Sequence, residues 1–401
     1  MIELGAMDPE VTDAASAAYA REVERVTRLA LASVQSGRDK LVPRRVLPAG
    51  PTVMRVAQVQ QALRDLGFFP GGAVDGICGY RTQSAIRLFQ EYVRSVERLD
   101  CTPDGAVGPQ TQANIMRWLA GGLRTVWAPT IDAWNAGTLQ PGEYGEWLAL
   151  LERVKQQYLA APSRVLQLVN DFRGASDTRK VADWDFAAAG NIHLIGIRRS
   201  EMRGKFDDIF VLLIKGLVFK FQGTTEPGAS ENPKGPPHLV PGQHSYHFGW
   251  HRRSYLALRP QSAGVLVVRA GADKVLDDSD LARGLEPNAT INIHWGGLGM
   301  TRDIRTWSEG CQTINGTVYI NAGGDVVSCS RFAATTPSEA TTDPKKTWGA
   351  YNVLLDLVNA LGGDLPGNTV KYTLLPEADL GLAPALATGL ADARGRVVAM
   401  A

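Results

Sequence analysis

One stretch of this 401-residue chain, Asp75-Gly76-Ile77-Cys78-Gly79-Tyr80-Arg81-Thr82, carries its clearest structural signal. The Asp-Gly pair predicts a tight turn, because glycine adopts left-handed dihedral angles without steric cost. Thr82 is expected to cap or open a helix, and the apolar residues Ala85, Ile86 and Phe89 are expected to bury one of its faces. The stretch therefore predicts a turn followed by an amphipathic helix.

A related signal recurs at Pro103-Asp104-Gly105-Ala106-Val107-Gly108-Pro109, with Thr111 after it. The last proline of this segment stands where a helix begins, since its fixed φ suits a first helical turn. Upstream, apolar residues recur at helical spacing over residues 56–66. We therefore expect residues 53–120 to form a compact helical module.

The module resembles the peptidoglycan-binding domain family, whose signature of Asp-Gly, Gly, Thr, Ala-Ile and Phe-Gln is met between Asp75 and Gln90. The second turn resembles that of the family's longer variants. This resemblance implies that the protein's partner is peptidoglycan and that the module supplies residence on the polymer rather than chemistry. Cys78 and Cys101 are interpreted either as a disulfide or as two buried free thiols.

Length and composition define the rest of the architecture. Single cores stop growing beyond roughly 250 residues, so the chain is expected to be a multidomain α+β protein. A formal charge of +1 gives no electrostatic reason to expect nucleic acid as a partner, and no run approaches the ~18 apolar residues of a membrane span. The predicted parts outside the helical module are an N-terminal helix (11–36) and linker within 1–52, a helical connector (121–190), a mostly β catalytic domain (191–380) and a peripheral tail (381–401).

Two segments of the β-rich part bring together the groups that a nucleophilic cysteine needs. Ile291-Asn292-Ile293-His294 alternates as a strand, and Ser308-Glu309-Gly310-Cys311 follows after a loop. A cysteine nucleophile needs a base and needs donors for the oxyanion that forms on its substrate. A cationic imidazole beside the thiol is expected to lower the pKa of the thiol from its usual value of about 8.5.

This pair of segments resembles the catalytic motif of the L,D-transpeptidase family, in which a strand ending in His is followed by Ser-His-Gly-Cys. The resemblance implies that Cys311 is the acyl-accepting nucleophile and His294 its base, oriented by the backbone carbonyl of Trp295. It implies that Ser308 shapes the loop, and that Gly310 and Cys311 lend their amides to an oxyanion hole. No cofactor is implied.

The sequence departs from that family at two places. Glu309 replaces the second His of the motif, and Gln312-Thr313 stands where the family has Asn or Arg. Binding of a substrate carboxylate must then come from elsewhere, and the candidates are Arg302 and Arg305, with solvated loop charges as the alternative. The segment Thr224–Gly228 loosely resembles the family's entrance segment.

Three of the six histidines fall between the residues 241 and 253. We interpret Tyr246, Trp250 and His251 as lining the substrate groove beside Glu309, with plain packing as the alternative. A zinc-dependent wall peptidase is the rival enzyme, but His244 and His247 point to opposite faces of a strand, and no metal site is predicted. A third possibility is a wall-binding protein whose catalytic fold is inactive.

The predicted activity is attack on L,D peptide bonds of peptidoglycan stems, with transfer to an amine or to water. The enzyme would work in the periplasm, in the wall or outside the cell. No signal peptide is visible, and residues 5–9 resemble a cloning scar. A housekeeping enzyme, a phage lysin and a secreted effector all fit this pattern.

Overall fold

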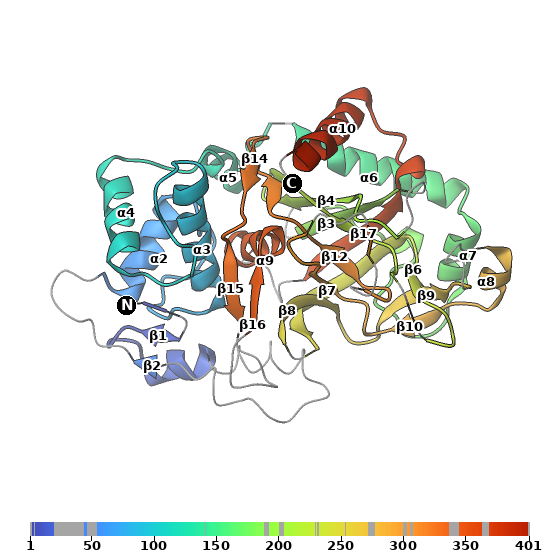
Figure 1. The fold of residues 1–401 in the computed structure, drawn as a ribbon, viewed down its shortest axis with the longest axis horizontal. Coiled ribbons are helices and arrows are strands. Elements are labelled where there is room, and N and C mark those ends of the chain that lie inside the picture. Colours follow the sequence, from blue (N-terminus) through green and yellow to red (C-terminus); the bar gives the residue numbers. More distant parts are fainter. Residues whose placement is uncertain are drawn as a thin grey trace.

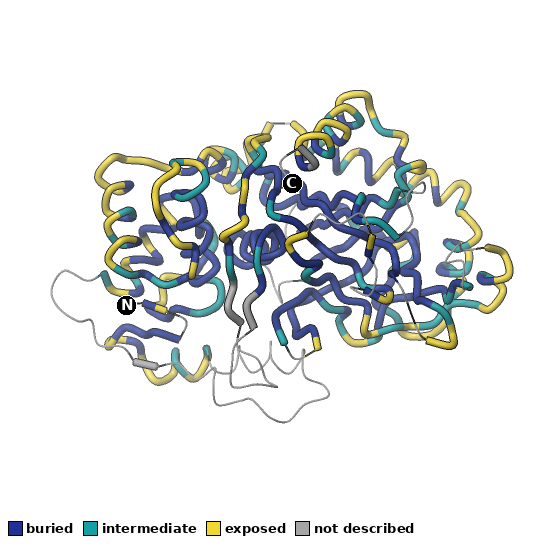
Figure 2. Tube along the Cα trace, in the orientation of Figure 1, coloured by how far each residue is buried: buried dark blue, intermediate teal, exposed yellow. Residues whose placement is uncertain are grey.

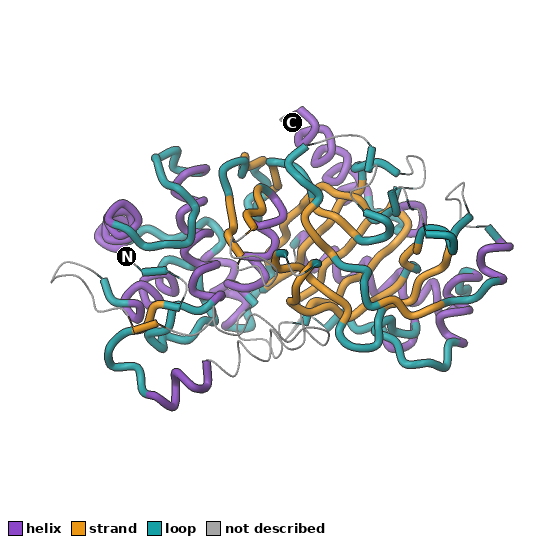
Figure 3. Tube along the Cα trace, turned by 60° about the horizontal axis from the view of Figure 1, so that its bottom comes forward, coloured by secondary structure: helices purple, strands orange, loops and turns teal. Residues whose placement is uncertain are grey.

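The computed structural model combines a helical N-terminal region with a β domain (Figure 1). It describes residues 2–3, 5–19, 44–45, 54–140, 142–187, 192–199, 204–228, 230, 232–252, 254–271, 277–299, 303–304, 308–336, 345–362 and 369–399. Figure 3 shows the strands gathered in one half of the molecule and helices dominating the half that holds the N-terminus. Of the helix expected over residues 11–36, residues 13–19 are helical and those from 20 onward lie outside the described part.

Three helices build the N-terminal module: α2 (Val56–Asp65), α3 (Tyr80–Ser95) and α4 (Pro109–Ala120). Their shared core is aromatic. The ring of Phe68 lies 5.4 Å from that of Phe89 and 5.7 Å from that of Trp118, centroid to centroid. The helical periodicity of the sequence therefore predicted this module correctly.

The two Asp-Gly turns are built alike. Gln60 accepts a hydrogen bond from the amide of Gly76 at 2.9 Å and donates to the hydroxyl of Thr82 at 3.0 Å. The equivalent residues of the second turn are Gln90, Gly105 and Thr111, with contacts of 2.8 and 3.0 Å. Thr82 thus ties the turn to α2, and the N-cap of α3 is Gly79, which corrects the expected capping role of this threonine.

A connector of three helices follows: α5 (Ala128–Asn135), α6 (Glu143–Ala160) and α7 (Arg164–Asp171). Helix α6 buries Trp147, Leu151 and Val154 in a cluster that also contains residues of the first two strands of the β domain, Ile195 and Val211. The connector therefore packs on the outer face of the β domain rather than acting as a free spacer.

Eight described strands pair into a closed ring, which makes the β domain barrel-like. In ring order they are β12 (Gln312–Ile314), β11 (Ile293–Trp295), β8 (Tyr255–Pro260), β7 (Gly242–His251), β17 (Val370–Pro376), β3 (Ile192–Arg198), β4 (Asp208–Ile214) and β5 (Leu217–Thr224), and β5 pairs back with β12. Strands β13 (Val318–Ile320) and β14 (Val326–Ser328) extend the sheet beyond β5.

Smaller sheets flank this ring. They comprise β6 (Pro237–Leu239) with β9 (Val265–Arg269) and β10 (Glu286–Asn288), β15 (Ala333–Thr336) with β16 (Lys345–Trp348), and β1 (Ala6–Met7) with β2 (Arg44–Arg45).

Side chains fill the interior of the barrel. The hydroxyl of Tyr372 on β17 donates to the side-chain carbonyl of Gln312 on β12 at 2.9 Å, although these two strands lie on opposite sides of the ring. The hydroxyl of Tyr246 on β7 donates to the backbone carbonyl of Ile291 at 2.9 Å. The barrel is therefore a packed core and not a pore.

Helix α9 (Ala350–Leu361) joins the two halves and is buried along its whole length (Figure 2). It packs against α3, and there the guanidinium of Arg87 holds the carboxylate of Asp356 through contacts of 2.7 and 2.5 Å. The two residues are only 5% and 1% exposed. One continuous core spans the module and the barrel, so the module is docked rather than tethered.

One apolar run of the sequence divides into two strands, and the prediction for the tail needs correction. The apolar run over residues 211–221 forms two strands, because Lys215 and Gly216 both adopt positive φ and make a two-residue hairpin turn. The tail is not peripheral. It forms helix α10 (Pro384–Ala399), which buries Leu386 and Leu390 against the barrel.

All four cysteines are free thiols, and Cys78 and Cys101 are both buried. None of the helices within the described ranges is long and apolar enough to cross a membrane.

Candidate active site

The site is built on β11 and β12, which pair in parallel with His294 opposite Thr313. The pairing continues one residue further, because the amide of Gln312 donates to the carbonyl of Asn292 at 2.9 Å. Side chains alternate along a strand, so Cys311 and His294 share one face of the pair. Gln312 points the opposite way, into the barrel, so the shared face is the outer one.

The position of His294 fixes which nitrogen carries its proton. Nδ1 lies 2.9 Å from the carbonyl oxygen of Trp295 and 3.3 Å from the hydroxyl of Tyr255. A carbonyl only accepts, so Nδ1 must be protonated and Nε2 keeps a lone pair. Burial lowers the pKa of His294 to about 4, and the hydrogen bond to Trp295 opposes this shift. The resting imidazole is therefore neutral and can act as a base.

A second histidine supports the first. The ring of His251, at the end of β7, stacks on that of His294 with centroids 4.1 Å apart. Nδ1 of His251 lies 3.0 Å from the side-chain nitrogen of Asn292, which belongs to the same face as Cys311. The stacked ring of His251 therefore supports His294 from β7.

The thiol of Cys311 is neutral as well. Its sulfur donates to the carbonyl of Thr290 at 3.2 Å and accepts from the amide of Asn292 at 3.4 Å. Burial raises the pKa of Cys311 to about 11, against the smaller lowering effects of the Asn292 amide and of Arg252 and Arg259. Both shifts favour a neutral thiol and a neutral imidazole over the ion pair expected from the sequence.

Ser308 shapes the turn that presents Cys311. Its hydroxyl donates to the carbonyl of Cys311 at 2.7 Å and accepts from the amide of Gly310 at 3.2 Å. A Cβ on Gly310 would lie 2.4 Å from the carbonyl oxygen of Pro237, so only glycine fits there. The amide of Gly310 already has a partner, and Glu309 is exposed on the outside of the turn.

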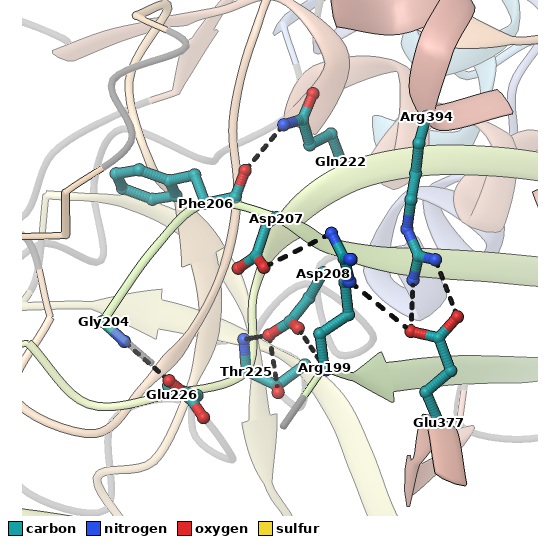
Figure 4. Close-up of polar contacts among 10 residues, drawn as sticks. All are labelled: Arg199, Gly204, Phe206, Asp207, Asp208, Gln222, Thr225, Glu226, Glu377 and Arg394. Atoms are coloured by element: carbon teal, nitrogen blue, oxygen red, sulfur yellow. Dashed lines mark hydrogen bonds and ion pairs between the residues drawn. The ribbon is translucent and has the colours of Figure 1, made fainter. Parts of the chain in front are cut away.

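The segment Thr224–Gly228 borders this turn, since the amide of Gly228 donates to the carbonyl of Ser308 at 2.6 Å. The buried carboxylate of Asp208 anchors this segment at Thr225 (Figure 4). Asp208 accepts from the amide of Thr225 at 2.6 Å, from its hydroxyl at 2.8 Å and from the amide of Arg199 at 2.8 Å. Burial raises the pKa of Asp208 to about 7 despite these three hydrogen bonds.

Two arginines that the sequence analysis did not select lie near the site. Arg252 sits at the tip of the β7–β8 hairpin, is exposed and has a positive φ of 46°. Arg259 on β8 donates to the carbonyl of Trp250 at 3.1 Å. The alternation of β8 could have indicated Arg259, and the hairpin turn could have indicated Arg252. Arg302 and Arg305 lie outside the described residues.

Two residues expected to line the groove lie in the core instead. Tyr246 and Trp250 are 0% and 3% exposed, because the alternation of β7 directs them into the barrel. His251, the third residue of that set, points to the outer face beside His294. The prediction was wrong for the two aromatic residues because a strand has only two faces, and the interior of a closed barrel takes one of them.

No group of three or more His, Cys, Asp or Glu side chains within the described part of the chain is arranged to hold a metal ion. Both ring nitrogens of His244 have protein partners: Nδ1 lies 2.9 Å from the hydroxyl of Thr178 and Nε2 lies 3.1 Å from the carbonyl of Val240.

Comparison with known families identifies the N-terminal module. Residues 54–115 match the family described as "Putative peptidoglycan binding domain", so the chain contains a peptidoglycan-binding domain where the two Asp-Gly turns lie. Curated proteins show no significant match.

One solved structure is matched, a fused Zn-dependent amidase/peptidase/peptidoglycan-binding domain-containing protein from Clostridium acetobutylicum ATCC 824. The identity is 15%, the match covers 65% of this chain and 86% of that chain, and the TM-score is 0.22. A TM-score this low does not establish a common fold.

Proposed function

We propose that the chain is a cysteine acyl enzyme that acts on L,D peptide bonds of peptidoglycan stems, with its catalytic unit in residues 191–380. The observation that carries this proposal is the shared outer face of β11 and β12, which holds both Cys311 and a neutral histidine with a lone pair on Nε2. The resemblance of the two sequence segments to the L,D-transpeptidase motif supports the same assignment.

The chemistry starts from the neutral pair. As the Cys311 sulfur attacks the carbonyl carbon of the stem peptide, its proton passes to Nε2 of His294. When the C–N bond breaks, that proton moves to the leaving amine and a thioester remains on Cys311. An acceptor amine or water then attacks the thioester and restores the thiol, which gives cross-linking or trimming respectively.

Arg252 is the best-placed described residue to bind a carboxylate of the stem. It is exposed, and its charge acts on both Cys311 and His294. Its left-handed backbone conformation is uncommon for a residue with a side chain, and such strain is concentrated at functional sites. A guanidinium can hold a carboxylate through two hydrogen bonds.

The peptidoglycan-binding domain indicates where this chemistry takes place. It would hold the enzyme on the wall, so we place the protein in the periplasm, in the wall or outside the cell. Because the domain is docked onto the barrel through Arg87 and Asp356, substrate binding and catalysis occur on one rigid body.

Purified muropeptides test the proposal when they are incubated with untreated, alkylated and chelator-treated protein. Loss of turnover on alkylation alone is the expected result, and Cys311→Ala should behave in the same way while still sedimenting with insoluble peptidoglycan. Loss on chelation alone would identify a zinc peptidase instead. Absence of turnover in all samples would leave a wall-binding protein without activity.

A further inference from the structure

The surroundings of His294 lack the carboxylate that supports the histidine base of many nucleophilic enzymes. Within the described ranges, no Asp or Glu side chain forms a hydrogen bond or an ion pair with this imidazole, and its hydrogen-bond partners there are the carbonyl of Trp295 and the hydroxyl of Tyr255. The charge of Arg252 adds to burial in lowering the pKa of His294. The protonated form of the base therefore depends on neutral oxygen atoms for its stabilisation.

The hydroxyl of Tyr255 presents its oxygen to the imidazole. Tyr255 is the first residue of β8, and its Oη lies 3.3 Å from Nδ1 of His294, which also lies 2.9 Å from the carbonyl oxygen of Trp295. Because Nδ1 carries a proton, it has no lone pair that could accept a hydrogen bond from a phenol. The oxygen of Tyr255 must therefore face the Nδ1–H group and share this hydrogen with the carbonyl.

Aromatic packing fixes the position of this hydroxyl. Tyr255 is buried, and the centroid of its ring lies 5.2 Å from that of His251, 6.2 Å from that of Tyr351 and 6.4 Å from that of Trp295. Burial raises the pKa of Tyr255 above its ordinary value, so the phenol is neutral at physiological pH. A dipole that is held in place and shielded from water interacts strongly with a charge that develops beside it.

We propose that Tyr255 is a positioning residue which, together with the carbonyl of Trp295, stabilises the imidazolium form of His294. This inference rests on the proposed function, in which His294 takes up the thiol proton. As Cys311 attacks the donor carbonyl, its S–H bond breaks, Nε2 gains the proton, and the Nδ1–H group acquires part of the positive charge. The two oxygens stabilise this charge until Nε2 passes the proton to the leaving amine. Two neutral oxygens thus take the role of a carboxylate.

Tyr255→Phe tests this role, because it removes the oxygen and keeps the ring. Acylation and transfer both pass through the imidazolium, so kcat for muropeptides should fall roughly tenfold while KM stays unchanged. NMR titration of protein with labelled histidines gives a second readout, with the resonances of His294 assigned from their loss in His294→Ala. The pKa of His294 should fall below its wild-type value, while the Nδ1–H tautomer persists because the carbonyl of Trp295 is still present.

Tyr351→Phe is the matched control, because Tyr351 is a neighbouring buried tyrosine whose hydroxyl donates to the carbonyl of Leu256 rather than contacting His294. It should melt at a lower temperature but keep the wild-type kcat and the wild-type titration of His294. An unchanged titration in Tyr255→Phe would overturn the proposal whatever happens to kcat, and so would an equal shift in Tyr351→Phe, which would assign the effect to packing. Failure of the proposed function is separate, since it appears as absent turnover in the wild type and leaves the NMR comparison intact.

Discussion

The imidazole rings of His251 and His294 stack with their planes 27° apart and their centroids 4.1 Å apart. Stacking excludes water from one face of His294, and it contributes to the burial that lowers the pKa of this histidine to about 4. In the proposed mechanism His251 is therefore a positioning residue, which holds His294 and keeps it neutral.

Replacing His251 by alanine is expected to lower kcat for muropeptides roughly two- to tenfold, because an aromatic contact contributes about 0.5–1.5 kcal/mol. Water would then reach His294 and raise its pKa toward the ordinary value near 6.5, so the acid limb of the pH–rate profile should move to higher pH. His251→Phe retains the ring and should leave that limb near its original position. An acid limb that stays in place in His251→Ala would show that the stacking does not set the pKa.

The ion pair between Arg87 and Asp356 gives a second prediction. Arg87→Ala leaves a buried carboxylate without its cation, and breaking such a pair costs about 3–5 kcal/mol in the free energy of unfolding. Urea unfolding at neutral pH measures the loss. Burial already raises the pKa of Asp356, so the folded state of the variant takes up a proton more readily and the defect should shrink as the pH falls.

The double variant Arg87→Met, Asp356→Leu serves as the control for this experiment, because it removes both charges and keeps the volume. It should recover most of the stability lost in Arg87→Ala. If it remains as unstable as the single variant, the loss reflects packing between α3 and α9 rather than an uncompensated charge.

Asp208 supports the turn that presents Cys311 without touching it. Its carboxylate accepts a hydrogen bond from the amide of Thr225, and the amide of Gly228 in the same segment donates to the carbonyl of Ser308 in that turn. Asp208→Asn replaces one carboxylate oxygen by an NH2 group, which would then face N–H or O–H donors instead of accepting from them. This mismatch should cost roughly 1–3 kcal/mol in the free energy of unfolding. We also expect slower turnover with an unchanged KM, because the turn that presents the thiol loosens. Rescue by Asp208→Glu is not expected, since the pocket is closed around the shorter side chain.

The sequence was sufficient where local rules determine the structure. The Asp-Gly turns and the helical periodicity predicted the peptidoglycan-binding domain, and the alternation of residues 291–294 predicted the strand that ends near His294. These features depend on residues close together in the chain, so they can be predicted from a single sequence. The assignment of Cys311 and His294 to catalysis remains a prediction.

Long-range pairing could not be predicted. The barrel closes where β12 pairs with β5, which are separated by almost ninety residues, and this closure places Tyr246 and Trp250 inside. The neutral state of the cysteine and histidine pair follows from burial by the same closure. Arg252 was not selected because the sequence does not show that the turn between β7 and β8 brings its charge near Cys311 and His294.

The charge state of the pair leads to the last prediction. In the resting protein the thiol of Cys311, with a pKa of about 11, shares a strand face with a histidine that is uncharged above pH 5. Its alkylation rate should therefore rise toward pH 11 rather than level off below pH 8. His294→Ala removes no positive charge and admits water, so the midpoint of the alkylation curve should fall.

Arg252→Ala should shift the same curve the other way, because this arginine lowers the pKa of the thiol. The rates are to be measured in proteins whose other three cysteines are alanine, so that only Cys311 reacts. A midpoint that rises in His294→Ala would demonstrate a thiolate and imidazolium pair in the resting enzyme, because only a cationic histidine can stabilise the thiolate by its charge. The two variants thus measure separately how His294 and Arg252 affect the pKa of the Cys311 thiol.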